Sequence, residues 1–272
     1  MGKKGRKGGG SPAARVDPHK ANRIHKSKKK LQQQQQQQQG KAKGGGHRHS
    51  PSSSSSAVAG NGGHGYAKDQ RVLLLGEGDF SFAAALALLW QDASNLTATA
   101  FDDEASCATK YRGLADNVST IRSLGGTVLF GVDACKSHTH KTVAKRAPFE
   151  RIIFNFPHTG TGIKDQARNV ASNQALLRGT FSSCLTGGLL APGGKGELHM
   201  TLKKGPPYDS WQPVVIAKMC GLAVRHCAPF RPERFPGYAH RRSIGDDHAG
   251  GAQQHVANAE ISGARTYCFV PR

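Results

Sequence analysis

The chain has 272 residues and a formal net charge of +20, from 38 Lys or Arg and 18 Asp or Glu residues. Its six cysteines contain no C-x-x-C pair, and no apolar run approaches the roughly eighteen residues of a membrane helix, which excludes a zinc ribbon and a membrane-spanning protein and indicates a reducing compartment. The first quarter is too poor in apolar residues to share a core, so we expect one folded domain of about 200 residues.

Residues 1–68 are expected to form a disordered basic arm. They contain fifteen of the basic residues against the single acid Asp17, and they include low-complexity tracts at Lys26–Lys30, Gln32–Gln39 and Ser52–Ser56. Such tracts cannot bury enough apolar area to offset chain entropy. The charge favours a nucleic-acid partner, because neutralised phosphates release counterions, and the lysine cluster suits a nuclear or nucleolar address, a phosphate contact or both. A solubilising tail is the alternative.

From Asp69 to Arg272, short apolar runs alternate with helix-length segments. This alternation is typical of βαβ units and predicts an α/β sandwich with a mostly parallel sheet. The predicted strands are 71–75, 96–101, 127–132, 151–156, 196–202, 222–227 and 266–270, and the predicted helices are 80–90, 107–124, 165–185 and 210–220. The stretch 244–262, rich in Gly, Ala, Gln, Asp and His, predicts a long loop, after which the last strand returns antiparallel.

The sequence GEGDF, Gly76–Phe80, joins the first predicted strand to the first predicted helix. In an open α/β sheet the ligand lies outside the carboxyl ends of the strands, and this first turn is the usual cradle. Gly76 and Gly78 allow positive φ and a close approach of the backbone to a ligand, while the helix dipole points at the same place. Alone, the two glycines fit a plain tight turn equally well.

Two acids follow the next two predicted strands. Asp102 ends the second strand, where a carboxylate can accept both hydroxyls of a ribose, and Asp133 ends the third, beside the expected position of an adenine. Each acid by itself is more often a helix cap or a solvated loop residue. Together with the glycine turn, the acids predict an adenosine-binding crevice at three successive strand ends.

Nicotinamide dinucleotides and S-adenosylmethionine both use such a crevice. The dinucleotide fingerprint is G-x-G-x-x-G, and Ser81 stands where the third glycine would be. Glu77 and Asp79 would oppose a pyrophosphate, whereas they suit the ammonium and sulfonium of S-adenosylmethionine. We therefore predict S-adenosylmethionine as the cofactor and no metal. The predicted cofactor-binding residues are Gly76, Glu77, Gly78, Asp79, Asp102 and Asp133.

The fourth predicted strand ends in RIIFNFPHTG, Arg151–Gly160, which brings Asn155 and His158 to the same edge. In methyltransferases that act on nitrogen, an Asn or Asp followed by an apolar residue and proline is common here. Its side chain and a backbone carbonyl can accept hydrogen bonds from the target base, and a ring just beyond can stack on that base. The alternative is a strand end with a proline-stiffened turn. We predict Asn155 and His158 as the catalytic residues.

Six stretches resemble the Rossmann-like domain of the eukaryotic large-subunit (25S-type) rRNA uridine-N3 methyltransferase family. They are LLLGEGDFSFAAALA, ATAFDDE with KY, GVDA, FNFPHTG, GELHMTLKKGPPYDSW and RFPGYAHRR, and they keep the family's order over nearly all of residues 71–272. The family's GEGDFSF falls on Gly76–Phe82, its strand-two aspartate on Asp102, its VDA on Val132–Ala134 and its NFPH on Asn155–His158. The long arm and the loop 244–262 depart from the pattern, which affects partner contacts and not the catalytic residues.

The resemblance implies a class I methyltransferase fold, a three-layer sandwich with a seven-stranded, mostly parallel sheet and an antiparallel last strand. It also implies an S-adenosylmethionine-dependent rRNA methyltransferase of ribosome biogenesis, located in the nucleus and nucleolus, whose partner is large-subunit rRNA or a preribosome. We expect a monomer with no membrane association.

Methylation at N3 of uridine requires loss of a proton with a pKa of about 9, by a general base or with a hydrogen bond that stabilises the anion. His158 is the candidate base, and Asn155 is expected to hold the uracil edge. Two groups could bind RNA backbone and stack bases, namely Lys203–Lys204 with Tyr208 and Trp211, and Tyr238 with Ala239–Arg242. For the lysine pair, a solvated face is equally expected.

Two other classes of protein fit parts of the pattern. A non-catalytic RNA-binding assembly factor could keep the methyltransferase-like fold and bind RNA without binding the cofactor. A nicotinamide-dependent reductase could use the same crevice, but the missing third glycine disfavours it.

Overall fold

The computed structural model describes residues 65–242 and 258–272. Nearly all of the predicted arm and most of the loop 244–262 lie outside the described residues. The described part begins four residues before the predicted domain start at Asp69. Tyr66 is buried there, with 7% of its surface exposed, and its ring lies 6.5 Å from that of Phe82 and 6.3 Å from that of Phe235. Tyr66 therefore packs as part of the folded domain.

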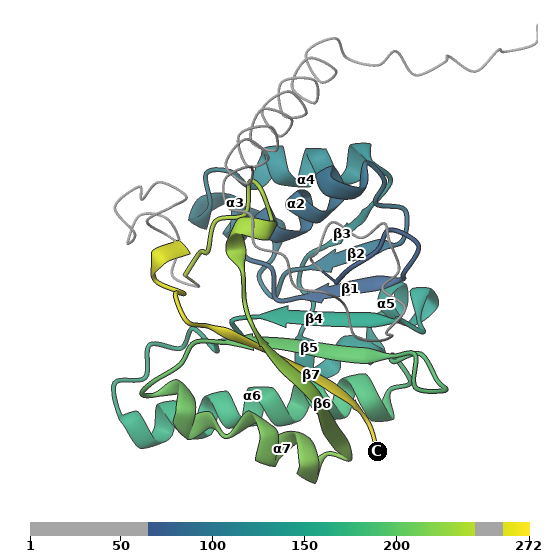
Figure 1. Ribbon diagram of the computed structural model, residues 1–272. Coiled ribbons are helices and arrows are strands. Elements are labelled where there is room, and N and C mark those ends of the chain that lie inside the picture. The colour runs from purple at the N-terminus through teal and green to yellow at the C-terminus, as the bar shows by residue number, and fades with distance from the viewer. Residues whose placement is uncertain (1–64, 243–257) are drawn as a thin grey trace, which may run out of the picture. The chain divides into compact units, whose positions relative to one another are not determined.

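Seven strands form one sheet in the order β3-β2-β1-β4-β5-β7-β6 (Figure 1). Pairing is parallel from β3 through β5, while β7 runs antiparallel to both β5 and β6. All seven predicted strands are confirmed, as is the antiparallel last strand. The strands are β1 (Val72–Leu75), β2 (Leu96–Thr99), β3 (Thr127–Leu129), β4 (Arg151–Asn155), β5 (Glu197–Leu202), β6 (Leu222–Pro229) and β7 (Arg265–Pro271).

Helices cover both faces of the sheet, as Figure 1 shows. One face packs against α2 (Ser81–Trp90), α3 (Glu104–Lys110) and α4 (Leu114–Ser123). The other packs against α5 (Lys141–Arg146), α6 (Gln166–Thr186), α7 (Pro213–Met219) and the 3-10 turn η1 (Ala134–Thr139). Two further 3-10 turns are η2 (Tyr208–Trp211) and η3 (Pro232–Arg234). Within the described ranges, no helix combines the length and apolarity that crossing a membrane requires.

Two helix predictions need correction, and one helix was not predicted. The predicted helix 107–124 is two helices, because Tyr111 adopts an extended conformation (φ −131°, ψ 109°) that ends α3. The predicted helix 210–220 divides at Gln212, whose φ of 50° lies outside the helical region. Helix α5 was not predicted, since its six residues, KTVAKR, include only two apolar side chains and show no clear periodicity.

The central strand β1 is buried on both sides. Val72 and Leu74 pack with the α2 and α4 side, while Leu73 and Leu75 pack with the α6 and α7 side, and none of the four is more than 1% exposed. A strand covered on both faces reads as a continuous apolar run, which explains VLLL. The parallel strands point their carboxyl ends to one edge of the sheet, and the candidate site lies there.

Candidate functional site

The turn Gly76–Phe80 leaves β1 at the carboxyl edge, between β2 and β4. Gly76 has a φ of +63°, and a Cβ on it would lie 2.3 Å from Cε2 of Phe154, so only glycine fits. A Cβ on Gly78 would lie 3.0 Å from the ring of Tyr111. Glu77 N donates to the carbonyl oxygen of Thr99 at 2.8 Å, which ties the turn to the end of β2. The glycines therefore serve close packing of this turn.

The carboxylates of Glu77 and Asp79 bind the amino end of α2. Asp79 Oδ1 accepts a hydrogen bond from Ser81 N at 2.9 Å, and Glu77 Oε2 accepts one from Ala83 N at 3.1 Å. Free N–H groups at a helix start would otherwise form an anion site. Because two carboxyl groups already accept hydrogen bonds from these N–H groups, the groups are not free to bind a pyrophosphate. The capping therefore disfavours a dinucleotide more directly than the missing third glycine does.

The two acids differ in their electrostatic surroundings. Burial raises the pKa of Asp79, and Arg241, whose Nε lies 3.1 Å from Asp79 Oδ2, acts in the opposite direction. Burial raises the pKa of Glu77 to about 8, and no cationic side chain of the described residues pairs with it. Glu77 is therefore the acid that a bound ammonium group would stabilise most. This fits the amino acid end of S-adenosylmethionine.

Asp102 follows β2 with about one third of its side chain exposed. Its Oδ2 lies 2.7 Å from Lys110 Nζ, while the cap of α3 comes from Asp103, whose Oδ1 accepts from Ser106 N at 2.8 Å. The carboxylate of Asp102 is therefore not used as a helix cap. Phe101 beside it is 67% exposed. Sequence reasoning missed this apolar ring, although an aromatic residue just before an acid at a strand end was a usable signal.

Asp133 lies near the end of β3, as predicted, and serves as the N-cap of η1. Its Oδ1 accepts a hydrogen bond from Cys135 N at 2.8 Å, so one oxygen acts as the helix cap that was the alternative interpretation. Val132 N donates to Ala100 O at 2.9 Å, which holds this segment beside the end of β2. The glycine turn, Asp102 and Asp133 thus follow three neighbouring parallel strands at one edge.

Asn155 ends β4, and only the oxygen of its side-chain amide has a hydrogen-bond partner within the described residues. Thr201 Oγ1 donates to Asn155 Oδ1 at 2.7 Å and also bonds Thr266 Oγ1 at 2.9 Å. Asn155 Nδ2 is buried and has no partner within the described residues. Phe156, which follows, has a φ of +54°, a rare conformation for an aromatic residue. Unpaired buried donors and strained backbone gather at functional sites, so both features point to this segment.

His158 lies exposed at the same edge, with its ring 6.0 Å from that of Trp211. Its Nδ1 accepts a hydrogen bond from Gly160 N at 2.9 Å. Partial burial and the charge of Lys203 lower the pKa of His158, so the ring is neutral near pH 7. A neutral imidazole that accepts at Nδ1 carries its proton on Nε2. In this geometry His158 offers a hydrogen-bond donor and no free lone pair for a proton.

Two of the aromatic residues considered for base stacking are in the core. Trp211 is 1% exposed and Tyr238 is 5% exposed, so neither can stack on an RNA base. Tyr208 is partly buried and Lys204 is exposed. Arg242 has half of its side chain exposed and forms a two-bonded ion pair with Glu260, at 2.9 and 3.1 Å. Among the residues considered for RNA contacts, the exposed ones are therefore mainly the cations Lys204 and Arg242.

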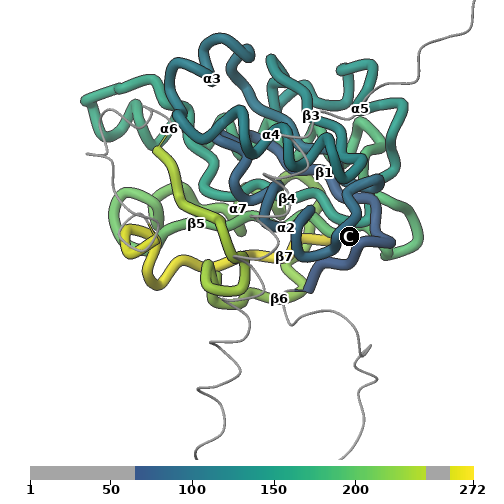
Figure 2. Tube along the Cα trace, turned by 90° about the horizontal axis from the view of Figure 1, so that it is seen from above, coloured from purple at the N-terminus to yellow at the C-terminus, as the bar shows by residue number. Residues whose placement is uncertain are grey.

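Residues 230–242, which follow β6, run across the sheet toward α2 and α3 (Figures 1 and 2). Ser81 Oγ donates to Ala239 O at 3.1 Å, Arg241 pairs with Asp79, and Tyr111 OH donates to Arg242 O at 3.2 Å. The motif RFPGYAHRR is thus bound directly to the motif GEGDFSF. Sequence reasoning could not find this contact, because the two motifs lie more than 150 residues apart.

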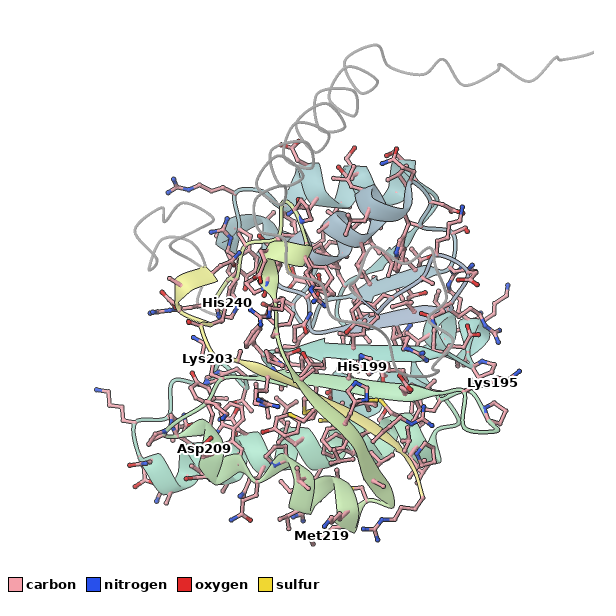
Figure 3. The ribbon with its side chains drawn as sticks, in the orientation of Figure 1. Lys195, His199, Lys203, Asp209, Met219 and His240 are labelled. Atoms are coloured by element: carbon pink, nitrogen blue, oxygen red, sulfur yellow. The ribbon has the colours of Figure 1, made fainter. Side chains whose placement is uncertain are left out.

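A buried polar cluster lies on the sheet away from this edge. One potential ligand atom from each of Glu197, His199 and Cys268 lies within 4.8 Å of the others, and Figure 3 labels His199. Glu197 pairs with the guanidinium of Arg151 at 3.3 Å and with His199 Nε2 at 3.0 Å, while His199 Nδ1 bonds the hydroxyl of Tyr66 at 3.0 Å. These groups lower the pKa of Glu197 to about 2, above all through the hydrogen bond from His199. The cluster is a hydrogen-bonded network that joins Tyr66 to the sheet.

The similarity to known proteins agrees with this geometry. A 25S rRNA (uridine(2634)-N(3))-methyltransferase of Saccharomyces cerevisiae is 30% identical over 250 residues, which cover 74% of this chain and 73% of the yeast protein. Heavy metal-associated isoprenylated plant protein 41 of Arabidopsis thaliana is 34% identical over 178 residues, which cover 65% of this chain. The chain spans only 34% of the length of that plant protein.

Among solved structures, a TehB-like SAM-dependent methyltransferase of Corynebacterium glutamicum has a TM-score of 0.42 at 12% identity, over 76% of this chain and 83% of that one. That likeness is too remote to indicate a function. The family described as rRNA (uridine-N3-)-methyltransferase BTM5-like matches residues 73–242. This range holds the glycine turn, Asp102, Asp133, the segment Asn155–His158 and the segment 230–242 that follows β6. The chain therefore belongs to the BMT5-like family of rRNA (uridine-N3-)-methyltransferases.

Proposed function

We propose that this protein is an S-adenosylmethionine-dependent methyltransferase that modifies N3 of a uridine in large-subunit rRNA during ribosome biogenesis. Family membership supports the reaction class. The structural observation that carries the proposal is the unpaired, buried Nδ2 of Asn155, at the end of the strand next to the glycine turn. A donor that lacks a partner in the protein is available for a substrate, and a uracil offers carbonyl oxygens to accept its bond.

The residues of the first three strand ends fit the cofactor. S-adenosylmethionine supplies a methyl group bound to a sulfonium. Asp102, which is not used as a helix cap, can accept hydrogen bonds from the ribose hydroxyls while Lys110 neutralises its charge. Glu77 offers a carboxylate without a cationic partner to the ammonium, and the tight turn at Gly76 and Gly78 lets the backbone approach. Phe101 offers an exposed apolar surface beside Asp102.

Asn155 and His158 fit the uracil base. Asn155 can donate from Nδ2, and His158 can donate from Nε2–H, because Gly160 N already occupies its Nδ1. Hydrogen bonds from both residues to the uracil carbonyl oxygens would stabilise the negative charge that develops when N3 loses its proton. Lys203, at the end of β5, and the exposed Lys204 lie where they can meet RNA phosphates.

The decisive experiment is methylation of large-subunit rRNA by the full-length chain, followed by mass spectrometry of the nucleosides. We expect 3-methyluridine. In calorimetry, Asp102→Ala should weaken S-adenosylhomocysteine binding by about tenfold or more, because a hydrogen bond to a charged group contributes about 1.5–3 kcal/mol. Lys195→Ala, at the opposite edge of the sheet in Figure 3, is the matched surface control and should bind normally.

Two outcomes would contradict the proposal in different ways. Methyl found on a ribose hydroxyl or on carbon 5 would overturn the target atom and leave the donor in place. Intact RNA binding with neither cofactor binding nor a methylated nucleoside would favour a non-catalytic assembly factor.

The cellular setting is also a proposal. The basic arm supports a nuclear and nucleolar location and contact with rRNA or a preribosome, because its lysine cluster suits both an import signal and phosphate binding. We propose that the protein acts as a monomer. Fluorescence imaging of the tagged chain and its mass in solution test these two statements.

A further inference from the structure

His240 lies at the carboxyl edge in a rigidly held segment. Its backbone N donates to Asn258 Oδ1 at 2.9 Å, and Asn258 Nδ2 donates to Tyr238 O at 3.1 Å, so Asn258 holds the chain on both sides. The neighbouring residues bind the cofactor turn, Ala239 through Ser81 and Arg241 through Asp79. The position of the His240 ring is therefore set by the same residues that set the turn.

The ring of His240 lies against the segment that carries Asn155. Its centroid is 4.6 Å from that of Phe156, in an edge-to-face arrangement at 62°. Figure 3 labels His240 near Lys203, at the end where β4 and β5 finish. Neither ring nitrogen has a hydrogen-bond partner within residues 65–242 and 258–272, and neither is sealed from solvent. One lone pair and one N–H are therefore available beside the uracil-binding residues.

The charges around this ring are mostly positive. Burial, the largest cause, and the cations Lys203, Arg242 and Arg241 together lower the pKa of His240 to about 3. Two acids pair with these cations: Glu260 lies 3.8 Å from Lys203 and 2.9 Å from Arg242, and Asp79 lies 3.1 Å from Arg241. The free ring is therefore neutral at any working pH. RNA phosphates that bind these cations would remove their part of this shift, so the pKa of His240 would rise when RNA binds, while the larger effect of burial would remain.

We propose that His240, and not His158, contacts the N3–H edge of the target uracil and accepts its proton. This inference rests on the proposed function. The geometry separates the two histidines, because the Nδ1 lone pair of His158 is used by Gly160 N while His240 keeps a free lone pair. In the reaction the N3–H proton passes to the ring nitrogen of His240, and the N3 electron pair forms the new N–CH₃ bond. The pair of the broken S–CH₃ bond stays on the donor sulfur, and the imidazolium later releases its proton to water.

The same contact would select uridine over cytidine. A neutral imidazole lone pair accepts a hydrogen bond from the N3–H of uracil, whereas cytosine has a lone pair at N3 and an amino group at C4. Asn155 Nδ2 would face that amino group instead of a carbonyl oxygen. Two mismatched contacts in a buried site disfavour cytidine, because polar groups would be left unpaired.

The test compares the pH dependence of single-turnover methylation in His240→Gln and His158→Gln. We expect His240→Gln to lose about 10²–10⁴-fold at pH 7 and to regain rate about tenfold per pH unit up to pH 9, as hydroxide removes the N3 proton instead. His158→Gln should be slower than the natural chain but keep its pH profile. His226→Gln, on exposed β6, is the matched control and should behave as the natural chain does. S-adenosylhomocysteine affinity within twofold for each variant shows that the turn is intact.

The proposal is overturned if His158→Gln acquires the pH-dependent rate, or if neither variant does. A second measurement needs no catalysis: nitrogen NMR of labelled histidine rings with S-adenosylhomocysteine bound. An oligonucleotide with the target uridine should shift the His240 ring signals, and one with cytidine there should not. If the natural chain yields no 3-methyluridine but this shift occurs, the proposed reaction fails while the His240 contact stands; no shift with either oligonucleotide rejects the contact.

Discussion

The substitution Asn155→Ala should abolish methyl transfer while changing the free energy of unfolding little. Asn155→Ala removes an amide whose Oδ1 accepts from Thr201 Oγ1 at 2.7 Å and whose Nδ2 is buried without a partner. Thr201 keeps its bond to Thr266 at 2.9 Å, so the substitution leaves that hydroxyl paired. The protein thus loses one hydrogen bond and one unsatisfied donor together.

The two effects oppose each other in the free energy of unfolding. Loss of the bond from Thr201 costs about 0.5–1.5 kcal/mol, while removal of a buried unpaired donor recovers about 1–3 kcal/mol. We expect Asn155→Ala to change the free energy of unfolding by between a loss of about 0.5 kcal/mol and a gain of about 2.5 kcal/mol, the sum of the two effects. Methyl transfer should nevertheless fall below detection, because the donor to the uracil carbonyl is gone. A residue that is neutral for folding and essential for activity is typical of a binding site.

Urea denaturation, calorimetry with S-adenosylhomocysteine and the methylation assay measure the three quantities. Cofactor affinity should stay within a few-fold, because Asn155 is proposed to contact the base. Thr201→Val is the matched control and should destabilise, since it leaves partners unpaired at both Asn155 and Thr266. A loss of more than about 2 kcal/mol with methyl transfer retained would refute the reasoning, because Nδ2 would then have an unrecognised structural partner.

Two more predictions follow from the acids and the arm. The pKa of Glu77 is raised from an ordinary 4.5 to about 8, so the folded protein keeps a proton that the unfolded chain has lost, and the free energy of unfolding should fall as pH rises from about 4.5 to 8. Urea denaturation at pH 5 and pH 8.5 should show that Glu77→Gln lacks this part of the fall; an equal fall in both proteins would place the effect elsewhere. Removal of residues 1–64 should lower RNA affinity and flatten its salt dependence without loss of stability, because Tyr66 and its bond to His199 remain. Removal of residues 1–68 should lower the unfolding temperature as well. If removal of residues 1–64 left the salt dependence of RNA affinity unchanged, the arm would be a localisation signal or a solubilising tail.

Local pattern was enough to predict much of the fold. Apolar runs such as VLLL and their alternation with amphipathic segments depend on which faces are buried, and that information is present in each short stretch. The positions of Gly76, Asp102, Asp133 and Asn155 at strand ends followed in the same way, since parallel strands end at one edge. The break at Tyr111 between α3 and α4 could not be predicted, because both halves share one helical periodicity.

The tertiary structure decided what each site residue is able to do. Glu77 and Asp79 cap α2, Gly160 N fixes the proton of His158 on Nε2, and Asn155 Nδ2 is left unpaired, although the sequence shows only that these side chains are polar. The contact of Ser81 with Ala239, 158 residues away, places His240 beside Phe156. Such pairings depend on the path of the whole chain, and local periodicity carries no information about which distant segments meet. The sequence thus determined the fold class and the edge where the site lies, whereas long-range packing determined its donors, its acceptors and its charges.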